Sequence, residues 1–219
     1  MAKQSEHGKL IAAAAKAALA PLGFRRVGQS RCWISDERWW ALWIEFQPSA
    51  WSKGSYLNVR PIWLWLRYGA HDHHPRPADF IKFESAEQFT PLIENMASIA
   101  AQTAVAMRAR FRTLEDVNRF FAERVSQDGF PVYRAAVTAG LVGDIAAARA
   151  HFKRMEDLDS KDYEPWIKLK SECATLAPLL DDPARYKSSI LEIISARRQK
   201  LRLPDDPQCL ESMGSIVAK

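Results

Sequence analysis

The densest group of side chains that could bind a metal is the consecutive run His71-Asp72-His73-His74. Imidazole and carboxylate ligands together suit zinc, nickel or iron. Catalytic metal sites, however, take ligands from positions that converge in space, such as two histidines four residues apart on a helix. Here the residues are adjacent, within a Gly-, His- and Pro-rich stretch at 69–79 that favours a solvated loop. A metal-dependent enzyme built on this run is our second alternative hypothesis.

Other signatures of catalysis are absent from the sequence. There is no GxGxxG motif, P-loop, GxSxG or HExxH pattern. Cys32 has no neighbouring His or Asn that could activate it as a nucleophile. No pair of the three cysteines has metal-binding or disulfide-framework spacing, which predicts free thiols in a reducing, cytoplasmic compartment. We therefore expect no cofactor and favour a non-catalytic protein.

Tryptophan is the most unevenly distributed residue type. Seven of the 8 tryptophans lie between Trp33 and Trp65, on consecutive predicted strands and their turns. One interpretation is a sheet covered on both faces, because indoles are the largest core-filling side chains. The other is that Trp39 and Trp43 stay partly open beside Arg60 and Arg31. Such a groove would bind a peptide, a base or an aromatic ligand.

The elements that position these residues follow from hydrophobic periodicity. The composition, 47% hydrophobic and 26% charged, is that of a globular protein, and no apolar run reaches the ~20 residues of a spanning helix. An amphipathic helix is predicted around 10–20, and strands at 24–34, 39–47, 56–67 and 80–83. The first of these strands contains Gly28-Gln29-Ser30, which predicts a bend or bulge. Short turns between the strands predict an antiparallel meander, and Pro61 predicts an edge position or a bulge.

Helices dominate the rest of the chain. Thr90-Pro91 resembles an N-cap followed by proline at the first helical position, which predicts a helix from there to about Arg112. Further helices are predicted at 114–125, 131–139, 144–155, 164–180 and 183–201. The expected fold is α+β, with an antiparallel meander packed with helices and then antiparallel helix hairpins. The expected regions are an α+β domain at 1–128, a helical hairpin region at 129–203 and a flexible tail at 204–219.

The charge distribution supplies the first alternative function. The formal net charge of +5 arises in the N-terminal half, where residues 1–115 hold 15 Lys and Arg against 10 Asp and Glu. Such a basic half could attract nucleic acid through its phosphates. The excess is small and unaccompanied by a dense basic cluster, so a solvated basic surface is the better explanation.

Residues 8–125 also resemble a bacterial family known as domain of unknown function 4304. The resemblance rests on a leading helix that runs into Leu22-Gly23-Phe24-Arg25-Arg26, then Phe46-Gln47-Pro48-Ser49, Tyr56-Leu57-Asn58-Val59 and Leu114-Glu115-Asp116-Val117. The family implies no activity or catalytic residues; some members look like immunity partners of bacterial toxins. The leading hypothesis is a protein-binding protein, with another protein or peptide as its partner and no membrane.

Overall fold

The computed structural model describes residues 5–67, 76–124, 129–159 and 163–211. The chain forms two compact units. The first comprises residues 1–63 and 71–109, and the second comprises residues 64–70 and 110–219. The first unit is a sheet with helices and the second is helical, so the predicted α+β fold class is confirmed.

The first unit is built on a five-stranded antiparallel sheet in the order β1-β2-β3-β4-β5. Its strands are β1 (Arg25–Arg26), β2 (Cys32–Asp36), β3 (Trp40–Gln47), β4 (Gly54–Trp63) and β5 (Ile81–Lys82). The predicted strand at 24–34 is two strands, β1 and β2, separated at the predicted bend around Gly28. Gly28, with φ of 57°, turns the chain between β1 and β2, which pair with each other.

Strand β4 is shorter than the predicted strand at 56–67, because it ends at Trp63. It pairs with β5 only through Gly54 and Ser55 within the described ranges. The rest of its far side is an edge, and Pro61 lies there, opposite Leu42 on β3. The missing N–H of a proline costs no ladder hydrogen bond at such a position. The predicted edge location of Pro61 is confirmed.

The three long strands have two different faces. One face, the inner face, is fully buried and consists of Trp33, Ser35, Leu42, Ile44, Phe46, Leu57 and Val59. Residues between these positions point the other way, because successive side chains alternate across a strand. Most of those are only partly buried. The sheet therefore places its core on the inner face.

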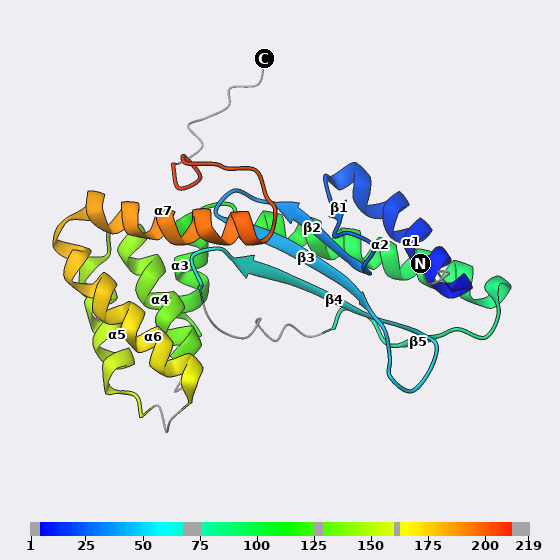
Figure 1. Cartoon of the computed structure of the whole chain (residues 1–219), viewed down its shortest axis with the longest axis horizontal. Helices are drawn as coiled ribbons and strands as arrows, with labels where there is room; N and C mark the ends of the chain where they lie inside the picture. Colours follow the sequence, from blue (N-terminus) through cyan, green and yellow to red (C-terminus); the bar gives the residue numbers. More distant parts are fainter. Residues whose placement is uncertain (1–4, 68–75, 125–128, 160–162, 212–219) are drawn as a thin grey trace, which may run out of the picture. The chain divides into compact units, whose positions relative to one another are not determined.

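Helices of the first unit supply the rest of that core. Helix α1 (Glu6–Leu19) buries Ile11, Ala15 and Leu19 and continues into a 3-10 turn at Ala20–Leu22. Helix α2 (Ala86–Arg110) passes behind the strands in Figure 1. Its buried stripe includes Phe89, Ile93 and Met96, the packing side expected of an amphipathic helix.

The start of α2 differs from the prediction at Thr90-Pro91. The helix begins one turn earlier, at Ala86, and Pro91 lies inside it. Ser85 is the cap, because its Oγ accepts a hydrogen bond from the Gln88 backbone N–H at 3.2 Å. The Ser85-x-x-Gln88 spacing is a capping-box pattern, so the true signal was present in the sequence. The competing Thr-Pro pattern obscured it.

Arg108, near the end of α2, links the helix to the sheet through hydrogen bonds. Arg108 donates to Glu37 Oε1 at 2.7 and 2.9 Å, to Ser35 Oγ at 2.6 Å and to the Leu22 carbonyl at 2.9 Å. Ser35 in turn donates to Glu37 Oε1 at 2.7 Å. The network joins α2, the segment after α1 and strand β2, so it stabilises the first unit as a whole.

The second unit contains α3 (Leu114–Ala122), α4 (Gly129–Leu141), α5 (Ile145–Asp157), α6 (Glu164–Leu176), a 3-10 turn at Ala177–Asp181 and α7 (Pro183–Lys200). Thr113 and Asp116 form a reciprocal capping box at the start of α3. Helix α4 is almost entirely buried and lies at the centre of this unit. The predicted helices are thus present, with their ends shifted by a few residues.

The predicted boundaries of two regions differ from the structure. Helix α3 belongs to the helical unit, whereas the sequence placed it in the N-terminal region at 1–128. The segment after α7 is also held in part: Cys209 and Leu210 are buried, and Arg198 Nε donates to the Pro204 carbonyl at 2.7 Å. Residues 212–219 of the expected flexible tail lie outside the described residues. None of the described helices is both long and apolar enough to span a bilayer.

Candidate functional site

The face of the sheet opposite the core carries a continuous set of polar and aromatic side chains. We define this outer face by seven partly exposed residues, Cys32, Trp43, Glu45, Gln47, Tyr56, Asn58 and Arg60. The strand register brings them into rows, with Trp43 opposite Arg60, Glu45 opposite Asn58 and Gln47 opposite Tyr56. Directly opposite residues have neighbouring side chains, so the face is one surface.

Trp43 and Arg60 contribute the most unusual feature of the outer face. The indole Nε1 of Trp43 and the Nε of Arg60 are both shielded from solvent, and neither has a hydrogen-bond acceptor among the described residues. Burial lowers the pKa of Arg60, and the negative charge of Glu45 offsets part of that effect. A shielded donor without an acceptor is destabilising, by about 1–3 kcal/mol for a typical group. The two donors lie on residues that are opposite each other in the strand register.

Hydrogen bonds link the polar side chains of the neighbouring rows. Asn58 Nδ2 donates to Gln47 Oε1 at 2.8 Å and to Glu45 Oε2 at 3.2 Å. Arg76 donates to Asn58 Oδ1 at 3.3 Å and to Gln47 Oε1 at 3.2 Å, and its guanidinium lies 4.1 Å above the Tyr56 ring. Glu45 is therefore engaged by Asn58. This polar network borders the Trp43–Arg60 pair. The pair is therefore the part of the outer face that still has unpaired hydrogen-bond donors in the described part of the chain.

The other two residues expected in the groove lie elsewhere. Trp39 is only 8% exposed and stacks on Trp63, at a centroid distance of 6.3 Å and an interplanar angle of 11°. It is therefore not part of an open groove, because its indole is used for packing. Arg31 donates to the Gly54 carbonyl at 3.1 Å and contacts His7 Nε2 at 2.9 Å.

The Arg31–His7 contact also defines the state of the histidine. Burial lowers the pKa of His7, and the positive charges of Arg31 and Lys53 lower it further. A neutral imidazole whose Nε2 accepts from the guanidinium is the form that fits this geometry. Arg31 thus links α1 to the start of β4 and has a structural role in this arrangement.

Trp51 is a surface residue that sequence reasoning did not single out. It is 95% exposed, on the loop between β3 and β4, where its backbone N–H donates to Ser49 Oγ. This loop follows Gln47 and precedes Tyr56, so it continues from one end of the outer face. An indole this exposed is unusual in a folded domain, and tryptophan is enriched at binding hot spots. Its position in a Pro-, Ser- and Gly-containing loop was the available signal.

The structure offers little support for chemistry at the remaining candidates. Burial raises the pKa of the Cys32 thiol, with a further contribution from Glu45, so the reactive thiolate is disfavoured. No metal-binding group of three or more His, Cys, Asp or Glu occurs in the described part of the chain. The run His71–His74 lies outside the described residues.

Comparison with known proteins gave no match to a family model, a curated protein or a solved structure. The resemblance to domain of unknown function 4304 therefore stays a prediction. The geometry of the outer face is the basis for a functional argument.

Proposed function

We propose that this protein is a non-catalytic binding protein that recognises another protein through its outer sheet face. The supporting observation is the pair of shielded donors, Trp43 Nε1 and Arg60 Nε, which have no acceptor in the described residues. A ligand oxygen that reached either donor would relieve the cost of leaving that donor unpaired. A partner would thus supply the hydrogen-bond acceptor that the free protein lacks at this site.

The chemistry of the pair favours a carboxylate as the incoming group. Arg60 carries a positive charge that is partly desolvated, which strengthens its interaction with an anion. Glu45 is already engaged by Asn58 and does not accept a hydrogen bond from Arg60 Nε. We therefore infer that an Asp, Glu or C-terminal carboxylate of the partner docks against Trp43 and Arg60, and that exposed Trp51 adds an apolar contact.

Toxin neutralisation is one concrete form of this function, prompted by the resemblance to domain of unknown function 4304. In that form the outer face would cover a catalytic surface of the partner. Nucleic-acid binding through the basic N-terminal half is the alternative. A steep loss of binding with increasing salt would distinguish it, because phosphate contacts release counterions.

The experiment is a differential capture from host extract with tagged wild-type protein and an Arg60→Lys variant, followed by mass spectrometry. Lysine keeps the positive charge but lacks the Nε–H donor and the planar guanidinium. Losing one charged hydrogen bond should weaken the partner about tenfold or more. Arg112→Lys is the matched control, because Arg112 is exposed and lies outside the face.

The expected result is a stoichiometric protein that wild type and the Arg112→Lys control retain in moderate salt and that the Arg60→Lys variant loses. Equal recovery with all three proteins would show that the outer face does not bind the partner. Nuclease-sensitive material that salt removes would replace this proposal with the nucleic-acid alternative.

A further inference from the structure

A surface pocket of about 330 Å³ lies in the first unit, beside the loop that joins β3 to β4. This volume is at the lower end of the range for small-molecule sites. Helix α1 contributes one residue to the wall, and the loop with the first residue of β4 contributes the rest, so that His7 and residues 48–54 line it. Neither Trp43 nor Arg60 is among them, so this loop pocket is separate from the donor pair of the outer face.

The charge of the loop pocket is positive. Lys53 is the only ionised side chain among the described residues that line it, and Glu6, which precedes His7 in the chain, is not part of the wall. Lys53 forms no ion pair within the described ranges. Its ammonium lies close enough to His7 to lower the pKa of the imidazole. The wall therefore carries one positive charge without a counter-ion.

Arg31 adds a second positive charge behind this wall. Its guanidinium donates to the Gly54 carbonyl at 3.1 Å and contacts His7 Nε2 at 2.9 Å, so it touches two of the lining residues. Burial lowers the pKa of Arg31, and no carboxylate of a described residue offsets that effect, whereas Glu45 offsets it for Arg60. The electrostatic potential at the loop pocket is therefore positive, which favours an anionic ligand over a neutral or cationic one.

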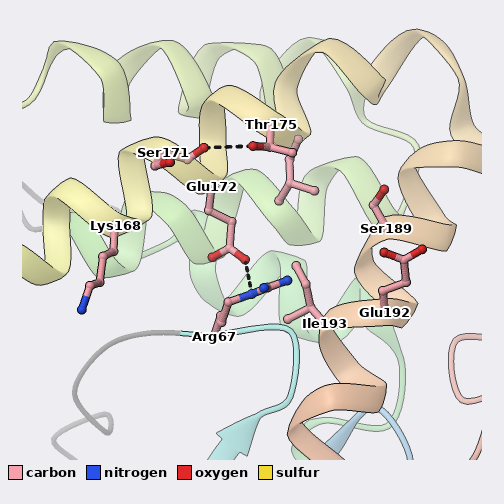
Figure 2. Close-up of a pocket in the computed structure, with 9 residues that line it drawn as sticks. Arg67, Lys168, Ser171, Glu172, Thr175, Ser189, Glu192 and Ile193 are labelled. Carbon is pink, nitrogen blue, oxygen red and sulfur yellow. Dashed lines mark hydrogen bonds and ion pairs between the residues drawn. The ribbon is translucent and has the colours of Figure 1, made fainter.

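The pocket of the helical unit, by contrast, has balanced charges. It lies between α6 and α7, and its charged lining residues are Arg67, Lys168, Glu172 and Glu192 (Figure 2). Arg67 Nε lies 3.2 Å from Glu172 Oε1, so these two charges already compensate each other. Two cations and two carboxylates favour neither sign of ligand charge. Of these two pockets, only the loop pocket selects a charged ligand.

Trp51 supplies an aromatic surface at the loop pocket. It lines the pocket, and its 95% exposure leaves the indole ring available to a ligand. Pro48 and Ala50 add further apolar wall. Another planar ring would stack well on the indole, because stacking removes two apolar faces from water. The loop pocket thus combines uncompensated positive charge with a planar apolar surface.

We propose that the loop pocket binds a small aromatic oxyanion, a planar ring that carries a carboxylate or phosphate group. The oxyanion accepts from the Lys53 ammonium in the positive potential of Arg31, and the ring stacks on Trp51. Ser49 Oγ accepts from the Trp51 backbone N–H at 3.1 Å, so its own O–H remains available as a further donor to the anion. The site shares Trp51 with the proposed protein-binding surface, but it does not depend on the protein partner.

The test is a titration of the ¹⁵N-labelled full chain with benzoate and with phenyl phosphate, followed through the amide signals and the indole N–H signal of Trp51. Benzamide, an uncharged molecule of nearly the same shape as benzoate, is the ligand control. We expect saturable shifts at residues 49–54 with an anion, and at least tenfold weaker binding of benzamide. The anion that binds more tightly identifies the acidic group as carboxylate or phosphate.

Two variants with matched controls assign the binding to the loop pocket. Lys53→Gln should weaken binding of the anion about threefold to tenfold, because the cation of the wall is lost. Lys16→Gln, an equal charge change on exposed α1 outside the pocket, should leave it unchanged. Trp51→Ala should weaken binding several-fold through loss of the stacking surface, whereas Leu92→Ala, at an exposed apolar residue of α2, should have no effect. Lys53 and Trp51 are both exposed, so neither replacement disturbs the core.

Three results would overturn the proposal: no saturable shift with either anion, equal affinity for benzamide, or wild-type affinity in the Lys53→Gln or Trp51→Ala variant. The readout is independent of partner capture by the Arg60→Lys variant. Failure of the loop pocket would therefore leave the proposed protein interface standing, and failure of that interface would leave the loop pocket standing.

Discussion

The Arg108 network makes the sharpest prediction about stability. Replacing Arg108 with methionine keeps much of the side-chain volume but removes every donor to Glu37, Ser35 and the Leu22 carbonyl. Glu37 is left as a carboxylate whose side chain is 17% exposed, with the Ser35 hydroxyl as its remaining partner. The arginine itself is 28% exposed in its side chain.

The magnitude follows from these exposures. Breaking a fully buried ion pair costs about 3–5 kcal/mol, whereas an exposed pair contributes about 0–1 kcal/mol. Arg108 and Glu37 lie between these limits and nearer the buried one, so Arg108→Met should lower the free energy of unfolding by about 3 kcal/mol. For a chain of this size the loss corresponds to a fall in Tm of about 6–12 °C.

The assay is urea unfolding and calorimetry of the variant, with Arg112→Met as the control. Arg112 is exposed, so its replacement should change the free energy of unfolding by less than about 0.5 kcal/mol. A double-mutant cycle with Glu37→Gln should give a coupling free energy of about 1–3 kcal/mol. If Arg108→Met is no more destabilising than the control, the network does not stabilise the first unit and the reasoning is wrong.

Three further predictions concern other parts of the structure. Burial raises the pKa of Glu172 in the folded protein, so ionising this carboxyl costs stability as the pH rises from 4.5 through the raised pKa. Over that range Glu172→Gln should become more stable relative to wild type, measured by urea unfolding. Gly140→Ala would place a methyl group 2.6 Å from the buried ring of Tyr186, so it should lower the free energy of unfolding by about 1–3 kcal/mol in the same assay. Burial raises the pKa of the Cys173 thiol to about 12, whereas Cys32 is partly exposed, so a thiol reagent at mild alkaline pH should label Cys32 first and Cys173 only after unfolding; equal rates in the native protein would contradict the burial.

Much of the fold could be predicted because local patterns and tertiary packing agree. The alternation of Leu42, Ile44 and Phe46 with more polar residues predicts β3, and the structure buries those three on the inner face. The start of α2 could not be predicted correctly, because two cap-like patterns compete within six residues. Ser85 forms the cap, and Pro91 is accommodated inside the helix.

The candidate site was predictable only in part. Trp43 and Arg60 were named from the sequence, and the register places them opposite each other. Trp39 was grouped with them because of its residue type. In the structure it stacks on Trp63 and is buried. Residue type indicates what a side chain can bind, whereas strand register and the first residue of a strand decide the side on which it lies.

By itself, the sequence determined the α+β class, the meander, the helical second half and the concentration of tryptophan on the sheet, since these depend on periodicity along the chain. Only the tertiary structure decided which polar groups lose their water without gaining a partner. Trp43 Nε1 and Arg60 Nε are such groups on the sheet. Hydrogen-bond satisfaction depends on neighbours that are distant in the sequence, so no local pattern records it.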